Sequence, residues 1–155
     1  MFIFDKLCSR FARFLSKPRD VGMQITTNSP ERLSAALKKG DVLLVEGTSR
    51  ISAAIKYLTQ STWSHSALYI GDALGEPKDG SALLELLEAD INEGVRAVPL
   101  SNYYHMHTRI CRPVGLSEKN INRVVEYATS RLGHQYDTKN ILDLARYLIP
   151  TPPVP

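Results

Sequence analysis

The 155-residue sequence is poor in cysteine and has no long apolar run. It contains two cysteines, Cys8 and Cys111, and no Cys-x-x-Cys pair, which argues against both a disulfide framework and a cysteine-rich zinc site. No apolar stretch approaches the roughly 18 residues expected of a membrane-spanning helix, and the N-terminus lacks the pattern of a cleaved signal peptide. We therefore expect a cytoplasmic protein, with a peripheral position at the inner membrane face as the alternative.

Positive charge is concentrated at the N-terminus. The formal net charge is +3, yet residues 1–19 carry five basic residues against one acidic residue, so the rest of the chain is close to neutral. A nucleic-acid-binding domain needs lysine and arginine clustered across its folded face. The charge distribution therefore argues against nucleic acid as a partner.

Residues 1–19 have the pattern of a basic amphipathic helix. Its apolar residues recur at helical spacing: Phe4, Leu7, Phe11, Phe14 and Leu15. Such a helix can lie in an anionic membrane interface, which would make residues 1–17 a membrane contact. It can equally dock on its own domain, and the sequence leaves both alternatives open.

Replacing Phe11 and Phe14 by serine tests the membrane alternative. We expect weaker binding to anionic vesicles, because the change removes apolar surface that the interface would bury. Partition between vesicles and solution measures the effect. An unchanged partition would dismiss the membrane contact.

Beyond this segment, helix and strand signals alternate. Ser29 has the properties of an N-cap, Pro30 those of a first helical position, and Gly40 those of a helix end, which predicts a helix from Pro30 to Lys39. Apolar patterning then predicts, in order, a strand over residues 41–46, a helix over 51–58 and a strand from 65 to 70.

The second half predicts further strands followed by helices. The leucine-rich segment 82–90 is compatible with a helix in isolation, but the Asn-Glu-Gly turn and the alternation after it favour a hairpin. A strand is expected over 108–114, then a helix capped by Ser117 and closed by Gly133. Its apolar face would comprise Ile121, Val124, Val125, Ala128 and Leu132. An amphipathic helix over 138–149 and a proline-rich tail over 150–155 follow. This order indicates an α+β fold with a mainly antiparallel sheet flanked by helices.

Several short motifs resemble one enzyme family. In order they are Gly40-Asp41, Ser64-His65, Leu87-Glu88-Ala89, Gly94-Val95, Pro99-Leu100 and, in L-G-H-Q-Y-D, Tyr136-Asp137. Together they resemble the circularly permuted, NlpC-like papain-fold cysteine hydrolases, in particular the YiiX/YaeF-like group. The resemblance runs from about Lys39 to about Leu148. It implies a single papain-like domain over residues 20–149.

The resemblance also implies site residues. His65 would be the general base and acid, Glu88 would hold its imidazole in one tautomer, and Tyr136 would lie near the active site. Without the resemblance, a lone histidine on a strand is more often structural, and Glu88 would be interpreted as an exposed strand residue. The substrate would be a peptide, another amide or a lipid acyl group, and no cofactor is implied.

The nucleophile departs from the family pattern. The family places its cysteine after the Tyr-Asp element, and this sequence has none after Cys111. We therefore expect the nucleophile beyond residue 155, in a domain that is incomplete at its C-terminus. Cys111 is a poor substitute, because strand alternation points the adjacent Arg112 to the other face. Cys8 has the character of a small apolar residue.

Two other classes of function stay open. A member without a nucleophile would be a non-catalytic module that binds lipid or peptide in a groove lined by aromatic residues, with the candidates Trp63, Tyr69, Tyr103, Tyr104 and Tyr136. Alternatively, His105 and His107 are two residues apart and would share a strand face. With His65 they could form a three-nitrogen metal site.

Overall fold

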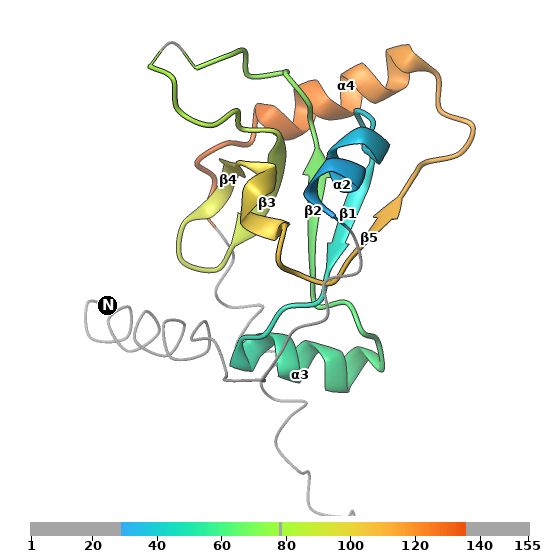
Figure 1. Ribbon diagram of the computed structural model, residues 1–155, viewed down its shortest axis with the longest axis vertical. Helices are drawn as coiled ribbons and strands as arrows, with labels where there is room; N and C mark the ends of the chain where they lie inside the picture. The colour runs from blue at the N-terminus through green and yellow to red at the C-terminus, as the bar shows by residue number, and fades with distance from the viewer. Residues whose placement is uncertain (1–28, 78, 136–155) are drawn as a thin grey trace, which may run out of the picture.

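The computed structural model describes residues 29–77 and 79–135 (Figure 1). Several predictions concern residues outside these ranges. They are the amphipathic helix over 1–19, Cys8, Tyr136, the helix over 138–149 and the tail over 150–155.

A single antiparallel sheet forms the centre of the described chain (Figure 1). Its five strands are β1 (Val42–Val45), β2 (His65–Tyr69), β3 (Leu86–Asp90), β4 (Gly94–Val98) and β5 (Thr108–Cys111). The spatial order is β4-β3-β2-β1-β5. Strands β1, β2 and β3 therefore each pair with the next strand along the chain, and β5 returns to pair with the free side of β1. The predicted α+β fold with an antiparallel sheet is confirmed.

The β3–β4 hairpin resolves the ambiguity of the leucine-rich segment. The Asp90 carboxylate accepts the N–H groups of Asn92 and Glu93, at 2.7 and 3.0 Å, which is the turn chemistry that favours a hairpin over a helix. Gly94 completes the turn with a φ of +76°, a conformation open to glycine. The resulting register places Glu88 directly opposite Arg96.

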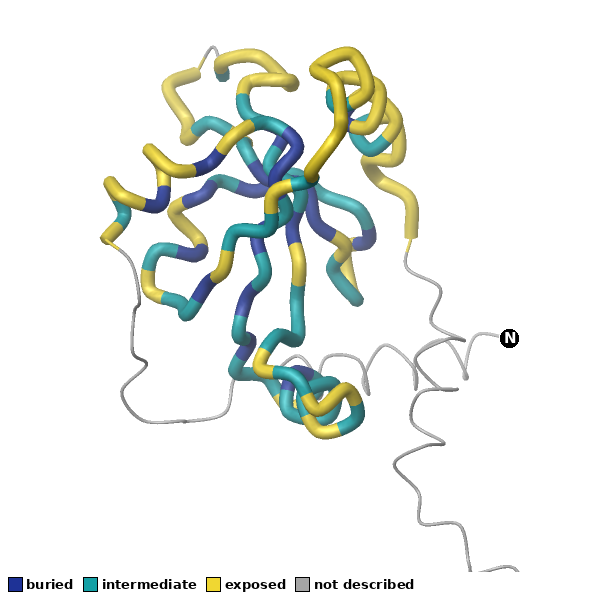
Figure 2. The backbone as a smooth tube through the Cα atoms, turned by 90° about the vertical axis from the view of Figure 1, so that its right-hand side faces the viewer, coloured by how far each residue is buried: buried dark blue, intermediate teal, exposed yellow. Residues whose placement is uncertain are grey.

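Helices cover both faces of the sheet. On one face, α2 (Pro30–Ala36) and the 3-10 helix η1 (Leu100–Tyr103) pack against the strands. The buried residues of this first core are Leu33, Leu37, Leu43, Val45, Ala67, Leu86, Val98, Leu100 and Tyr103. On the other face, α4 (Glu118–Thr129) contributes Val125 to a smaller core with Ile70 and Leu87. Figure 2 shows that buried segments are concentrated in the middle of the described chain, whereas the outer segments are largely exposed.

The helix α3 (Arg50–Thr59) lies at the end of β1 and β2 (Figure 1). Ser49 caps it by accepting the N–H of Ser52 at 3.1 Å. An ion pair of 2.9 Å between Lys56 and Glu46 joins the helix to the residue that follows β1. These contacts set α3 beside the strand ends where His65 lies, since His65 begins β2 and pairs with the last residue of β1.

Three predicted boundaries and one predicted helix face need correction. The first helix ends at Ala36 and not at Lys39, because Leu37 adopts an extended conformation and still packs into the first core. The strand predicted over 108–114 ends at Cys111, and α4 ends at Thr129. Val124 and Leu132 do not belong to the buried face of α4, since they are 46% and 37% exposed.

A buried carboxylate explains the early end of α2. Asp41 is 1% exposed and accepts the Lys38 N–H at 2.8 Å, which holds residues 38–41 in a turn. Arg112 donates to both carboxylate oxygens, at 2.9 and 2.7 Å, and also to the Ala36 carbonyl. Burial raises the pKa of Asp41, but the hydrogen bonds from Arg112 and Lys38 outweigh it and lower the pKa overall.

Asp41→Asn should therefore destabilise the fold. We expect the free energy of unfolding to fall by about 2 kcal/mol, because the amide loses two charge-assisted hydrogen bonds in a buried position. Urea denaturation near pH 7 measures the loss. Asp79→Asn is the matched control, since Asp79 is exposed and the change should cost less than about 0.5 kcal/mol. Equal effects of the two substitutions would contradict the structural role of Asp41.

Candidate active site

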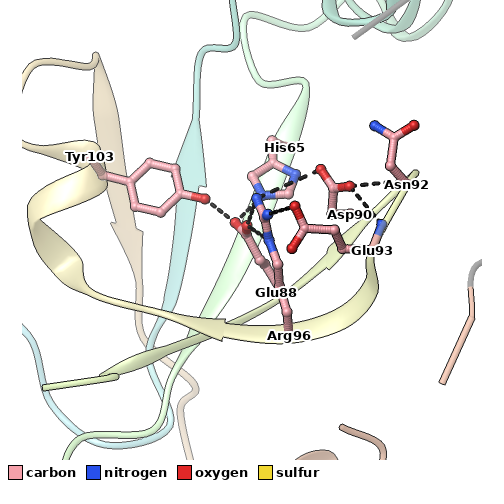
Figure 3. A network of polar contacts seen from close by, with 7 residues as sticks. All are labelled: His65, Glu88, Asp90, Asn92, Glu93, Arg96 and Tyr103. Atoms are coloured by element: carbon pink, nitrogen blue, oxygen red, sulfur yellow. Dashed lines mark hydrogen bonds and ion pairs between the residues drawn. The ribbon is translucent and has the colours of Figure 1, made fainter. Parts of the chain in front are cut away.

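His65 and Glu88 are brought together on the face of the sheet covered by η1. The register pairs Ala67 with Glu88, so His65, two residues before Ala67, is the diagonal neighbour of Glu88 on the same face. The distance from His65 Nε2 to Glu88 Oε2 is 2.8 Å (Figure 3). Tyr136, the third predicted site residue, lies outside the described residues.

Glu88 is a buried carboxylate with donors on both oxygens. Its side chain is 3% exposed. Arg96 approaches Oε1 through Nε and through Nη2, each at 2.8 Å, and the Tyr103 hydroxyl donates to Oε2 (Figure 3). Burial raises the pKa of Glu88, but the hydrogen bonds with His65, Tyr103 and Arg96 together outweigh it and lower the pKa to about 2. Glu88 is therefore a carboxylate at any physiological pH.

The ionised state of Glu88 assigns the tautomer of His65. A carboxylate can only accept a hydrogen bond, so Nε2 must carry the proton in the contact between them. In the neutral imidazole, the lone pair is then on Nδ1. Within residues 29–77 and 79–135, no side chain or backbone group forms a hydrogen bond with Nδ1. As far as these residues are concerned, the nitrogen with the lone pair is available for a reacting group.

A cavity of about 350 Å³ lies beside His65. Its lining combines apolar side chains, such as Ile51 and Ile55 of α3, with polar ones that include the charged groups of Glu88 and Arg96. Apolar surface with a few placed polar groups is the usual composition of a site for a small ligand.

A second cavity, of about 360 Å³, adjoins the first at His65 and includes Trp63 in its lining. The two cavities have Ser64, His65 and Ala89 in common. They meet here because the pairing of β2 with β3 ends at Ala67 and Glu88, although both strands continue. His65 therefore lies at the junction of two spaces.

Arg96 and Tyr103 are site residues that the sequence analysis missed as partners of Glu88. Arg96 also pairs with Glu93 at 2.8 Å. Burial lowers the pKa of Arg96, but the contacts with Glu88 and Glu93 outweigh this effect and raise the pKa overall. Burial and then the Glu88 contact raise the pKa of the Tyr103 hydroxyl well above its usual range. The hairpin turn contained a usable signal for Arg96, because counting the register back from Gly94 places Arg96 opposite Glu88.

Residues 36–147 match the family model described as permuted papain-like amidase enzyme, YaeF/YiiX, C92 family. The chain belongs to this family. The matched range covers most of the sequence and includes both His65 and Glu88. No individual curated protein matches the chain. The predicted family and its papain-like α+β fold are thus confirmed, and the family's amidase description supports a cysteine hydrolase scaffold.

Cys111 of this C92-family chain lies away from His65. Cys111 pairs with Val42 at one end of β1, whereas His65 pairs with Val45 at the other end, about 10 Å along the strand. Cys111 also alternates with Ile110, which packs against the core on the His65 face, so the thiol is on the opposite face of the sheet. Its geometry gives it no access to the imidazole.

The three-histidine metal site is not supported in the C92-family domain. Among the described residues, no group of three or more His, Cys, Asp or Glu side chains could hold a metal ion. His65 contacts Glu88, His107 contacts Glu46 through Nδ1 at 3.0 Å, and His105 is exposed. The three imidazoles are thus not arranged as common ligands.

The predicted aromatic groove is present only in part. Tyr103 lines the first cavity and Trp63 the second, whereas Tyr69 and Tyr104 pack against the first core.

Within the part of the chain that the structure describes, no helix has both the length and the apolar character to cross a membrane.

Proposed function

We propose that this chain supplies the histidine and carboxylate of a cysteine-dependent amidase or acyl hydrolase. His65 is the general base and acid, and Glu88 orients it. The observation that carries the proposal is the 2.8 Å contact of His65 Nε2 with the buried, ionised Glu88, which leaves Nδ1 without a partner among the described residues. The cavity beside His65 offers space for a substrate.

The proposed reaction has two stages. His65 Nδ1 takes the proton of a cysteine thiol, the thiolate attacks the substrate carbonyl carbon, and the imidazolium then gives the proton to the leaving amine, which leaves a thioester. In the second stage Nδ1 takes a proton from water and the hydroxide attacks the thioester carbon. The C–S bond then breaks, the carboxylic acid leaves, and the imidazolium returns its proton to the thiolate, which restores the thiol. Glu88 stabilises the imidazolium in both stages without itself becoming protonated.

The nucleophile is proposed to come from a segment beyond residue 155. The position of Cys111 on the opposite face of the sheet supports this proposal. Tyr136 is proposed as a further site residue. In support, the chain that leads to it lies along β4, where Gly133 N–H donates to the Val95 carbonyl and Val95 N–H to the His134 carbonyl, both at 2.8 Å.

The test begins with the intact mass of the natural gene product. We expect a mass greater than that of the 155-residue chain, with a cysteine in the additional C-terminal sequence. The product is then incubated with a series of acyl p-nitroanilides and p-nitrophenyl esters. Thiol-dependent hydrolysis, abolished by iodoacetamide, and a trapped acyl adduct on that cysteine are expected.

The opposite result favours the binding-module alternative. A natural product of the same mass as this chain, without thiol-dependent hydrolysis, would reject the amidase proposal. The cavity beside His65 would then be tested for binding of lipids or peptides.

A further inference from the structure

We infer that Tyr103 is a positioning residue that fixes the orientation of both members of the His65–Glu88 pair. The inference rests on the proposed function, since it concerns the same pair. Tyr103 is the last residue of η1 and is 7% exposed. It contacts the pair twice, through its hydroxyl to Glu88 and through its ring to His65.

The hydroxyl contact fixes the Glu88 carboxylate. Arg96 occupies Oε1, and the Tyr103 hydroxyl donates to Oε2 from the other side of the carboxylate (Figure 3). Rotation of the carboxylate would break both sets of contacts. The lone pairs of Oε2 that remain are therefore directed at His65 Nε2.

The ring contact limits the rotation of the imidazole. The centroids of the Tyr103 and His65 rings are 6.3 Å apart, and their planes differ by 21°. This geometry is within the range of attractive aromatic pairs. Tyr103 thus restricts rotation of the His65 ring directly through its own ring and indirectly through Glu88. The orientation of Nδ1 beside the cavity is therefore fixed.

The hydroxyl remains a donor under all relevant conditions. Burial and the neighbouring Glu88 carboxylate raise the pKa of Tyr103 far above its usual value, so the phenol stays protonated. Because Tyr103 always donates and Glu88 always accepts, the orientation of the pair does not change as His65 gains or loses its proton. A general base that must also act as an acid needs this constancy.

Tyr103→Phe separates positioning from core packing, because it removes the hydroxyl and keeps the ring. Tyr104→Phe is the matched control. Tyr104 is the next residue, and its hydroxyl contacts Ser34 at 3.4 Å and not Glu88. The readouts are the ¹⁵N chemical shifts of the His65 ring, which report the tautomer, and the ¹³C titration of the Glu88 carboxyl group.

In the wild-type chain we expect neutral His65 to carry its proton on Nε2. In Tyr103→Phe we expect a mixture of tautomers, and the pKa of Glu88 should rise from about 2 by about one unit, since one of its charge-assisted hydrogen bonds is lost. Tyr104→Phe should change neither signal. A folded Tyr103→Phe variant with wild-type values for both signals would overturn the inference.

A second measurement applies if Tyr103→Phe does not fold. In the wild-type chain, the Tyr103 hydroxyl proton should give a slowly exchanging, downfield ¹H signal with a nuclear Overhauser effect to the His65 ring. A rapidly exchanging hydroxyl together with mixed His65 tautomers would overturn the inference without any variant.

Kinetics of the full gene product separate this inference from the proposed function. We expect Tyr103→Phe to lower kcat about tenfold with little change in KM, because the loss concerns orientation and not substrate binding. An unchanged kcat in an active enzyme would overturn the catalytic role of Tyr103. If the NMR signals shift but the full product shows no thiol-dependent hydrolysis, the proposed function fails while the positioning of the pair by Tyr103 stands.

Discussion

Glu88→Gln is expected to lower the free energy of unfolding by about 3 kcal/mol at pH 7. The buried carboxylate accepts hydrogen bonds from Arg96, Tyr103 and His65, and glutamine replaces one accepting oxygen by a donating amide group. At least one buried donor then faces another donor. Removal of one member of a buried charged network typically costs about 3–5 kcal/mol.

The same substitution should reduce the acid sensitivity of the fold. The pKa of Glu88 falls from an ordinary 4.5 to about 2 on folding, so its ionisation stabilises the native state fully above about pH 4.5. This stabilisation is lost as the pH falls toward 2, and it amounts to about 3 kcal/mol. The unfolding free energy of the wild-type chain should therefore fall more steeply between pH 5 and pH 2.5 than that of Glu88→Gln.

Urea denaturation at several pH values measures both effects. Glu93→Gln is the matched control, since Glu93 pairs with the same Arg96 at 2.8 Å but its side chain is 65% exposed. An exposed ion pair contributes less than about 1 kcal/mol, so the control should retain the wild-type pH profile. Equal losses for the two variants would show that burial of Glu88 does not determine its contribution.

His65→Ala is expected to lower kcat of the full gene product by about 10²–10⁴-fold, because the imidazole both takes and returns the reacting proton. The stability of the fold should change much less, since Glu88 keeps Arg96 and Tyr103 as partners. Hydrolysis of the best acyl p-nitroanilide measures the loss.

The control for this prediction is His107→Ala. His107 also pairs with a glutamate, Glu46, and its side chain is 34% exposed, close to the 30% of His65. His107 does not line either of the cavities at His65. Retained activity in His65→Ala, or a comparable loss in both variants, would reject His65 as the base.

Local patterns were sufficient to predict most of the fold. Ser29 and Ser117 cap helices as predicted, and the turn at Asn92 and Gly94 correctly outweighed the helical composition of residues 82–90. The predicted ends of helices and strands were wrong where a residue distant in sequence determines them. The end of α2 depends on Arg112, which is more than seventy residues away in sequence.

The site was less accessible to sequence reasoning than the fold. His65 and Glu88 were selected through the family resemblance, because nothing in their local sequence distinguishes them from structural residues. Tyr103 was predicted only as a candidate groove residue, since its contact with Glu88 depends on the path of η1 across the sheet. Contacts of this kind depend on how distant segments pack together, so they can be identified only from the tertiary structure.

The network around Glu88 has an evolutionary consequence. Selection for a folded domain alone will preserve Glu88, because its loss leaves Arg96 and Tyr103 without their buried acceptor. His65 is more exposed and has fewer partners, so it is free to change once catalysis is no longer selected. Relatives that keep the carboxylate but have replaced the histidine would then mark the lineages that retained the architecture and abandoned the chemistry.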